Sequence, residues 1–151
     1  HIIKAMLLTA PEVKSLTCMV QKEVAERICA TPGGKAIGFL SIMCGYFGTP
    51  VKLFDVPPGA FFPPPKVTSS VFQIVIDPEM TARIPKESWL EFFKMVTAGY
   101  SQRRKKLATA LSSYIGTKKA VEELLEKEGL PPGARAEELS VDQWVTLFNA
   151  Q

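Results

Sequence analysis

The sequence is poor in the residues that most often build metal centres and histidine-dependent active sites. It has a single histidine, His1, and three cysteines, Cys18, Cys29 and Cys44. One histidine excludes the common zinc sites and most histidine-dependent catalysis. The cysteines lack metal-ligand spacing and lie in apolar stretches, which indicates buried free thiols in a reducing compartment. We therefore predict no metal site and a cytoplasmic protein.

Long hydrophobic runs and targeting features are also missing. No apolar run approaches the roughly 20 residues of a membrane span, and no signal-peptide pattern opens the chain. With 46% hydrophobic residues, the chain can still bury a substantial core. We expect a soluble protein with no membrane partner. The chain begins without methionine and inside an amphipathic pattern, so we expect it to be part of a longer protein.

The familiar phosphate-binding and nucleophile motifs are absent as well. The stretch TPGGKA (31–36) has neither the Walker nor the dinucleotide spacing. No nucleophile elbow and no paired-carboxylate pattern occurs. From the residues alone we therefore predict no catalytic machinery in this chain.

Alternating helix and strand patterns fill the first half of the chain. Helices are predicted over 1–10, 22–30 and 35–48, and strands over 13–21, 50–56 and 69–77. The strand–helix–strand order predicts a parallel pair of strands with a right-handed crossover. The short final connection predicts that the last two strands are antiparallel neighbours. Three strands make a thin sheet with an open edge, which we interpret as part of a larger α/β sheet.

The second half of the chain shows helical patterns only. They cover 86–100, 101–116, 117–130 and 140–150. The change of pattern falls near 77–84. We therefore predict two domains, residues 1–80 with the sheet and residues 81–151 as a small all-helical domain.

Acidic residues are absent from the window Phe92–Val121, which holds seven basic residues. Four of them are consecutive and are predicted to lie on a helix: Arg103, Arg104, Lys105 and Lys106. A solvated helix face is the ordinary interpretation of such a run. The lack of nearby acids favours phosphate binding, because arginine forks match phosphate oxygens and released counterions supply affinity. The run shows no pattern for contacts to base edges, so we expect it to position the nucleic acid through its phosphates without recognising its sequence.

A proline-rich connection, residues 57–68, separates the last two predicted strands, and we call it the proline elbow. It contains three consecutive prolines after Phe61 and Phe62. Prolines remove ladder donors and fix φ, so this segment is a stiff connection. Two interpretations stay open. Either both rings belong to the core, or the rigid loop holds one ring at the edge of the sheet. There a flat base could stack, at a gain of about 1–3 kcal/mol.

Three stretches, taken together, carry a family resemblance. They are MVQKEVAERICATPGGKAIGFLSIM (19–43), VPPGAFFPPPKVTSSV (56–71) and FFKMVTAGYSQRRKKLATAL (92–111). In the same order, over essentially the whole chain, they resemble the ribosomal RNA adenine dimethyltransferases, which methylate two adjacent adenines of small-subunit RNA. The elbow matches the family pattern F-x-P-x-P-K-V-x-S from Phe61 to Ser69.

The resemblance implies an α/β fold: the C-terminal part of a doubly wound Rossmann-like methyltransferase sheet, about three strands, followed by the small helical RNA-binding domain. In the family, the S-adenosylmethionine site and the N-[LI]-P-[YF] motif that grips the target amine lie upstream of the stretches matched here. The resemblance therefore implies an S-adenosylmethionine-dependent enzyme when intact, monomeric and acting on the small ribosomal subunit. The chain alone is expected to bind no cofactor and to be inactive.

The resemblance also assigns roles to individual residues. Phe61 is expected to stack on a flipped target adenine. The mouth of the active site is expected to contain Gln21, Lys22, Pro63 and Pro65. RNA contacts are expected at Lys66, Arg103, Arg104, Lys105 and Lys106. One departure concerns Ile37 and Phe39, where the family commonly has Tyr and Arg, so no RNA contact is carried over to that loop.

Two other functions remain possible at this point. One is a non-catalytic RNA-binding module that uses the fold only to hold nucleic acid. The other is a large-subunit rRNA adenine methylase of the resistance type, against which the SQRRKKL stretch argues, because it resembles the small-subunit enzymes.

Overall fold

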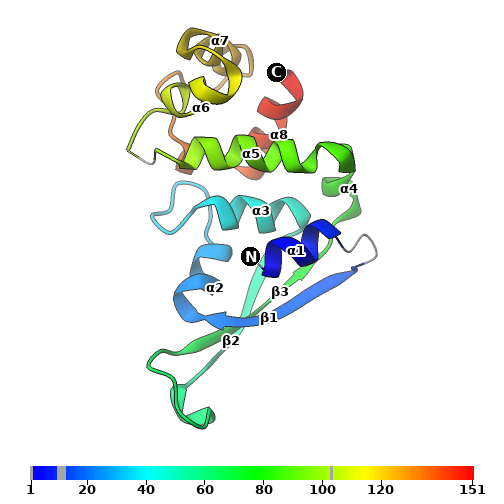
Figure 1. Cartoon of the computed structure of the whole chain (residues 1–151), viewed down its shortest axis with the longest axis vertical. Coiled ribbons are helices and arrows are strands. Elements are labelled where there is room, and N and C mark those ends of the chain that lie inside the picture. The colour runs from blue at the N-terminus through cyan, green and yellow to red at the C-terminus, as the bar shows by residue number, and fades with distance from the viewer. Residues whose placement is uncertain (1, 10–12, 103) are drawn as a thin grey trace.

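The computed structural model describes residues 2–9, 13–102 and 104–151. Its three strands are β1 (Ser15–Gln21), β2 (Pro50–Val56) and β3 (Ser69–Val75). The helices before β3 are α1 (Ile2–Thr9), α2 (Lys22–Ile28) and α3 (Phe39–Phe47). Those after it are α4 (Pro78–Thr81), α5 (Trp89–Tyr100), α6 (Leu107–Ile115), α7 (Lys118–Lys127) and α8 (Val141–Ala150). The molecule is elongated, with the proline elbow at one end and α7 at the other (Figure 1).

The sheet has the order β1-β3-β2, with β3 antiparallel to both neighbours. The predicted antiparallel pairing of the last two strands is confirmed. The predicted parallel pair is wrong as a pairing: β1 and β2 run in the same direction, but β3 lies between them. β3 is the central strand because its alternate residues Ser70, Phe72 and Ile74 are fully buried, whereas β2 is exposed along most of its length and suits an edge.

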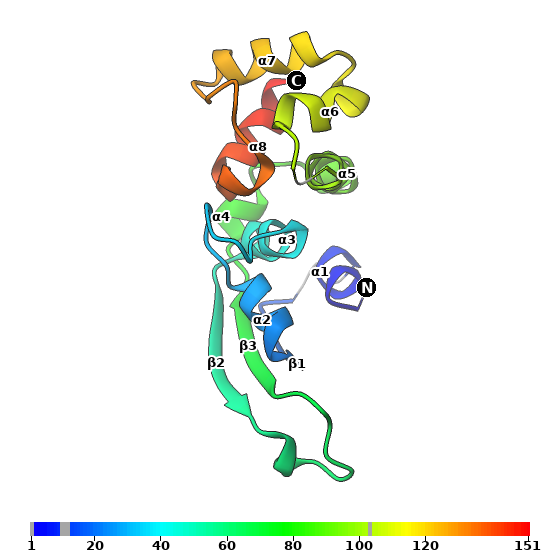
Figure 2. The ribbon, with the colours of Figure 1, turned by 90° about the vertical axis from the view of Figure 1, so that its left-hand side faces the viewer.

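Helices α1, α2 and α3 lie on one face of the sheet (Figure 2). That face is lined by buried Leu16 together with the buried side chains of β3. The opposite face presents apolar side chains that are about half exposed: Met19, Val51, Phe54 and Val75. The register places Met19, Val71 and Phe54 in one row across the three strands.

One cluster of buried residues extends from the sheet to α8. At its centre Tyr46 and Phe47 of α3 contact the rings of Trp89, Phe92 and Phe93. The Tyr46 hydroxyl donates a hydrogen bond to the carbonyl oxygen of Thr81 at 3.0 Å. This core crosses the predicted boundary at residue 80, and the division into two domains stays a prediction.

Two helices begin later than the sequence indicates. The helix predicted over 35–48 begins at Phe39, because Gly38 has an extended backbone and its N–H is accepted by the Ser41 hydroxyl at 3.0 Å. The helix predicted over 101–116 begins at Leu107. The chain must turn after Tyr100 so that α6 can pack back against α5. Within the described residues, no helix is both long and apolar enough to cross a bilayer.

The three cysteines are free thiols, of which Cys44 is buried and Cys18 and Cys29 are half-buried. Within the described residues, no cluster of histidine, cysteine and carboxylate side chains could hold a metal ion. Burial raises the pKa of the Cys44 thiol to about 12, and burial also raises the pKa of Cys18 and of Cys29.

Thiol labelling should therefore be slow in the folded protein. Because only the thiolate reacts, Cys44 should stay unmodified by iodoacetamide at pH 8, while denaturant exposes all three thiols to rapid labelling. Mass spectrometry of peptides from native and denatured samples would measure this. Labelling of Cys44 in the native protein at the rate of a small-molecule thiol would contradict the prediction.

Candidate nucleic-acid interface

The proline elbow projects beyond the end of the sheet (Figures 1 and 2). It begins with a short 3-10 turn, Pro58–Ala60, in which Ala60 and Phe61 donate backbone hydrogen bonds to the carbonyls of Pro57 and Pro58 at 3.0 and 3.2 Å. Residues 62–67, which follow half-buried Phe61, are all exposed. Proline has no N–H to satisfy, so such a run can stand in solvent without losing backbone hydrogen bonds.

Neither aromatic ring of the elbow belongs to the hydrophobic core. Phe62 is 101% exposed and Phe61 is half-buried. The interpretation of both rings as core residues is therefore wrong. The stacking role of Phe61 stays a prediction, and Pro63, Pro65 and Lys66 are exposed beside it.

The elbow leaves the sheet at the edge where two strands end. β1 ends at Gln21 and β2 ends at Val56, so both carboxyl ends lie beside the base of the elbow. Gln21 pairs with Ser69, and the N–H of Lys22 donates to the carbonyl of Thr68 at 3.0 Å. The structure thus brings the predicted mouth residues Gln21 and Lys22 to the base of the elbow.

A charged cluster around exposed Asp55 on the edge strand β2 joins these segments, and we call it the Asp55 clamp. Its carboxylate lies 3.1 Å from Lys22 Nζ and 3.0 Å from Lys52 Nζ, and it accepts a 2.6 Å hydrogen bond from the Ser70 hydroxyl. The clamp links the start of α2 to β2 and β3. Asp55 was not predicted as a site residue, because its partners Lys22 and Ser70 are distant in sequence. The one local signal was its position two residues before the first proline of the elbow.

The clamp shifts the titration of both charged partners. The Ser70 hydroxyl, with Lys52 and Lys22, holds the pKa of Asp55 well below its usual range. The hydrogen bond from Lys22 to Asp55 raises the pKa of Lys22. Lys22 therefore stays protonated and forms an ion pair with Asp55 at the base of the elbow.

The depressed pKa of Asp55 makes a pH-dependent contribution to stability. Such a carboxylate stabilises the fold above its unfolded pKa of about 4, and the contribution is lost as pH falls toward the folded pKa. Asp55→Asn keeps an acceptor for Ser70 but removes the charge. We expect its thermal midpoint to lie below that of the wild type by a constant gap from pH 5 to 8, which narrows below pH 4.

Circular dichroism melting at a series of pH values would measure this gap. Glu126→Gln is the matched control, since Glu126 is exposed and forms no ion pair among the described residues. A gap for Asp55→Asn that is independent of pH would show that the charge of Asp55 does not support the fold.

The predicted basic helix is instead a connection between α5 and α6, which we call the basic turn (residues 101–106). Arg103 lies outside the described residues, while Arg104, Lys105 and Lys106 are exposed and non-helical. The helical expectation is wrong here because buried Leu107 starts a new helix, α6, which packs back against α5. The N–H of Leu107 donates to the carbonyl of Ala134 at 2.8 Å, which anchors the end of the turn.

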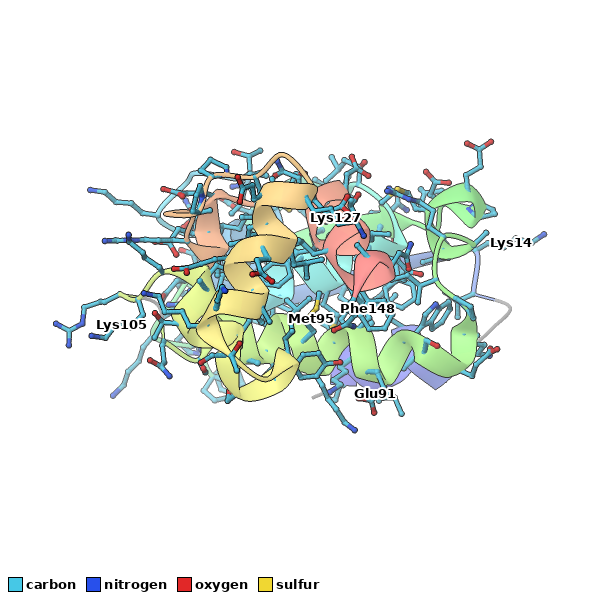
Figure 3. All side chains as sticks on the ribbon, turned by 90° about the horizontal axis from the view of Figure 1, so that it is seen from above. Lys14, Glu91, Met95, Lys105, Lys127 and Phe148 are labelled. Carbon is cyan, nitrogen blue, oxygen red and sulfur yellow. The ribbon has the colours of Figure 1, made fainter. Side chains whose placement is uncertain are left out.

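The basic residues of the acid-free window differ in their partners. In α5 and α7, Lys94, Lys118 and Lys119 pair with Glu91, Glu122 and Glu123. Within the described part of the chain, the side chains of Arg104, Lys105 and Lys106 form no ion pair. Figure 3 shows Lys105 at the periphery, directed away from the body of the molecule. The positive charge of Arg104, Lys105 and Lys106 therefore has no counterion among the described residues, which leaves it available to bind phosphate.

The basic turn and the proline elbow are separate sites. In Figures 1 and 2 the elbow lies at one end of the molecule, and the connection from α5 to α6 lies beyond α3. Lys66 lies on the elbow, whereas Arg104, Lys105 and Lys106 lie on the basic turn. A ligand that contacts both must be extended.

The described residues do not fit an adenosyl cofactor. In open α/β sheets such ligands bind on a glycine-containing turn directly after a strand. The adjacent glycines Gly33 and Gly34 instead follow helix α2, and the N–H of Gly33 is bound to the carbonyl of Glu137 at 2.8 Å.

Comparison with known proteins decides the family. A family model described as ribosomal RNA adenine dimethylase matches residues 1–151, which is the whole chain. The chain belongs to this family. The resemblance inferred from the three stretches of sequence is thereby confirmed.

Several curated proteins with one shared name are similar to this chain. The protein called ribosomal RNA small subunit methyltransferase A from Caldanaerobacter subterraneus is 42% identical over 138 residues, which are 91% of this chain and 51% of that protein. The protein of the same name from Xanthobacter autotrophicus is 47% identical over 140 residues, which are 92% of this chain and 46% of that protein. The chain thus spans about half the length of these relatives.

Two solved structures share the fold. A dimethyladenosine transferase from Plasmodium falciparum superposes with a TM-score of 0.81 at 21% identity, over 97% of this chain and 60% of that one. The 23S rRNA methyltransferase ErmE superposes with a TM-score of 0.65 at 21% identity, over 99% of this chain and 60% of that one. The predicted α/β methyltransferase fold class is confirmed.

Proposed function

We propose that this chain supplies the target-base and RNA-backbone contacts of an S-adenosylmethionine-dependent methyltransferase. The complete protein would dimethylate two adjacent adenines of small-subunit rRNA. The family and the names of its curated relatives support rRNA methylation. Residues 1–80 would be part of the catalytic domain, and residues 81–151 would bind RNA.

One structural observation carries the proposal. The elbow, Gln21 and Lys22 all lie where β1 and β2 present their carboxyl ends. In open α/β sheets, substrates and cofactors bind outside the carboxyl ends of the strands. An aromatic ring held at that edge can stack on a base that has been extruded from its helix.

The two surfaces have different tasks in this proposal. Phe61 holds the ring of the flipped adenine, with Pro63 and Pro65 stiffening its mount. The basic turn and Lys66 hold phosphates of the same RNA and fix its position without reading its sequence. Positioning matters because a misplaced target amine meets the methyl donor at the wrong distance or angle.

The test is a methylation assay with the protein expressed from its complete gene. Small-subunit and large-subunit rRNA are each incubated with labelled S-adenosylmethionine, and the modified nucleotides are mapped by mass spectrometry. We expect two adjacent dimethylated adenines in the small-subunit RNA. Methylation of the large-subunit RNA would support the resistance-type alternative, and RNA binding without methyl transfer would support a non-catalytic RNA-binding module.

A further inference from the structure

A groove between α1 and α5 opens beside the basic turn. Its volume is about 620 Å³, and its lining includes Ile3, Lys4, Phe39, Leu40, Tyr100 and Ser101. Ser101 also lines the adjoining hollow formed with Gln102, Arg104 and Lys105. The groove is therefore continuous with the phosphate-binding surface proposed above and separate from the elbow. We call it the α1–α5 groove.

Two aromatic rings form fixed walls of the α1–α5 groove. Phe39 is half-buried, and its ring meets Phe93 edge to face at 6.2 Å between centroids. Tyr100 is held at both ends: its hydroxyl donates to the carbonyl of Ala136 at 3.0 Å, and its ring stacks on Trp144 at 6.0 Å. Rings held in this way lose little freedom when a flat ligand stacks on them.

The charge of the groove points to an anionic ligand. Among the described residues that line it, the one charged side chain is Lys4, whose ammonium lies 5.9 Å from the centroid of the Phe39 ring. The carboxylates of Glu23 and Glu26 line the neighbouring pocket on the far side of Phe39 and Tyr100, and not the groove itself. The basic turn at the mouth adds Arg104 and Lys105. An apolar pocket with a cation above an aromatic ring and cations at its mouth matches a nucleobase that is attached to phosphates.

We propose that the α1–α5 groove binds one unpaired nucleotide of the bound RNA strand. Its base packs against Phe39 and Tyr100, and its flanking phosphates lie on Lys4 and the basic turn. This nucleotide is an anchor and undergoes no reaction, unlike the adenine at the elbow. The inference rests on the proposed RNA-binding function and extends it by a second base-binding site.

The test compares two single strands of eight nucleotides. One is a uridine strand with a central 2-aminopurine, whose fluorescence falls on stacking, and the other is an abasic strand of equal length. The variant is Phe39→Leu, which keeps apolar bulk against Phe93 but removes the ring. We expect it to weaken binding of the first strand by about 5- to 150-fold, the range for one stacked base, with loss of quenching and no effect on the abasic strand.

Two further variants test whether the groove itself binds the base. Thr97 is exposed on α5 and lines the groove, so Thr97→Leu fills the groove without altering the core and should also weaken binding of the base-containing strand only. Leu90→Ala is the matched control, since Leu90 is 57% exposed and lies outside the α1–α5 groove. It should change neither affinity, and circular dichroism melting confirms that each variant folds.

The outcomes separate this inference from the proposed function. If Phe39→Leu and Thr97→Leu leave binding unchanged, or weaken both strands equally, the anchor site is overturned while the RNA-binding function stands. If the wild type binds neither strand in a salt-dependent way, the proposed function fails and the anchor site fails with it.

Discussion

Arg104→Glu combined with Lys105→Glu is expected to weaken binding of single-stranded RNA by about 25-fold or more in 0.1 M salt. Each phosphate contact on a single strand contributes about 0.7 to the slope of log affinity against log salt, and two lost contacts remove about 1.4. At 0.1 M salt that loss corresponds to a factor of about 25, to which the new negative charges add repulsion. Fluorescence anisotropy at several salt concentrations gives both the affinity and the slope.

The chain offers a matched control for this experiment. Lys118→Glu combined with Lys119→Glu makes the same change in net charge on α7, where both lysines are already paired with Glu122 and Glu123. If the site is the basic turn, the control should leave the salt slope close to that of the wild type. Equal slopes for the two double variants would show that net charge, and not the basic turn, governs binding.

Much of the fold could be predicted from local patterns, and the rest depends on packing that local patterns do not contain. The strands and most helices follow from apolar periodicity. β3 lies between β1 and β2 because it buries more of its side chains than either neighbour. That difference is apparent only when the three strands are compared in the folded sheet. Gly48 is a second case: a Cβ there would lie 2.0 Å from the carbonyl oxygen of Val75, a contact between residues far apart in sequence.

The candidate site shows the same division. The consecutive basic residues could be recognised in the sequence. Their non-helical conformation could not be predicted, because it depends on Leu107 starting a helix that packs on α5. Among the described residues Arg104 and Lys105 form no ion pair, whereas Lys94, Lys118 and Lys119 do, and this difference depends on the fold rather than on the local sequence. The α1–α5 groove was not visible at all, because its walls come from segments at residues 3–4, 39–40 and 97–101.

The elbow carries two adjacent aromatic rings, Phe61 and Phe62, and their different exposure predicts which of them stacks on the target base. Phe62 is fully exposed, so its ring must be ordered entirely by the ligand, at a cost in side-chain entropy. Phe61 is half-buried, and its backbone is tied to the preceding turn by the hydrogen bond to Pro58. The ring already restrained by the protein is the better platform, which agrees with the position given by the family pattern.

Phe61→Ala in the complete protein should therefore lower kcat/KM for rRNA methylation by about 5- to 150-fold, the equivalent of one lost stacking contact of about 1–3 kcal/mol. Phe62→Ala is the matched control: it removes the same ring from the adjacent position and should have little effect. Phe61→Tyr should restore most of the rate, because a phenol ring still stacks, whereas Phe61→Leu should not. If Phe62→Ala were the damaging variant and Phe61→Ala were active, the adenine would stack on the exposed ring at the tip. The half-buried ring of Phe61 would then serve only to hold the elbow in shape.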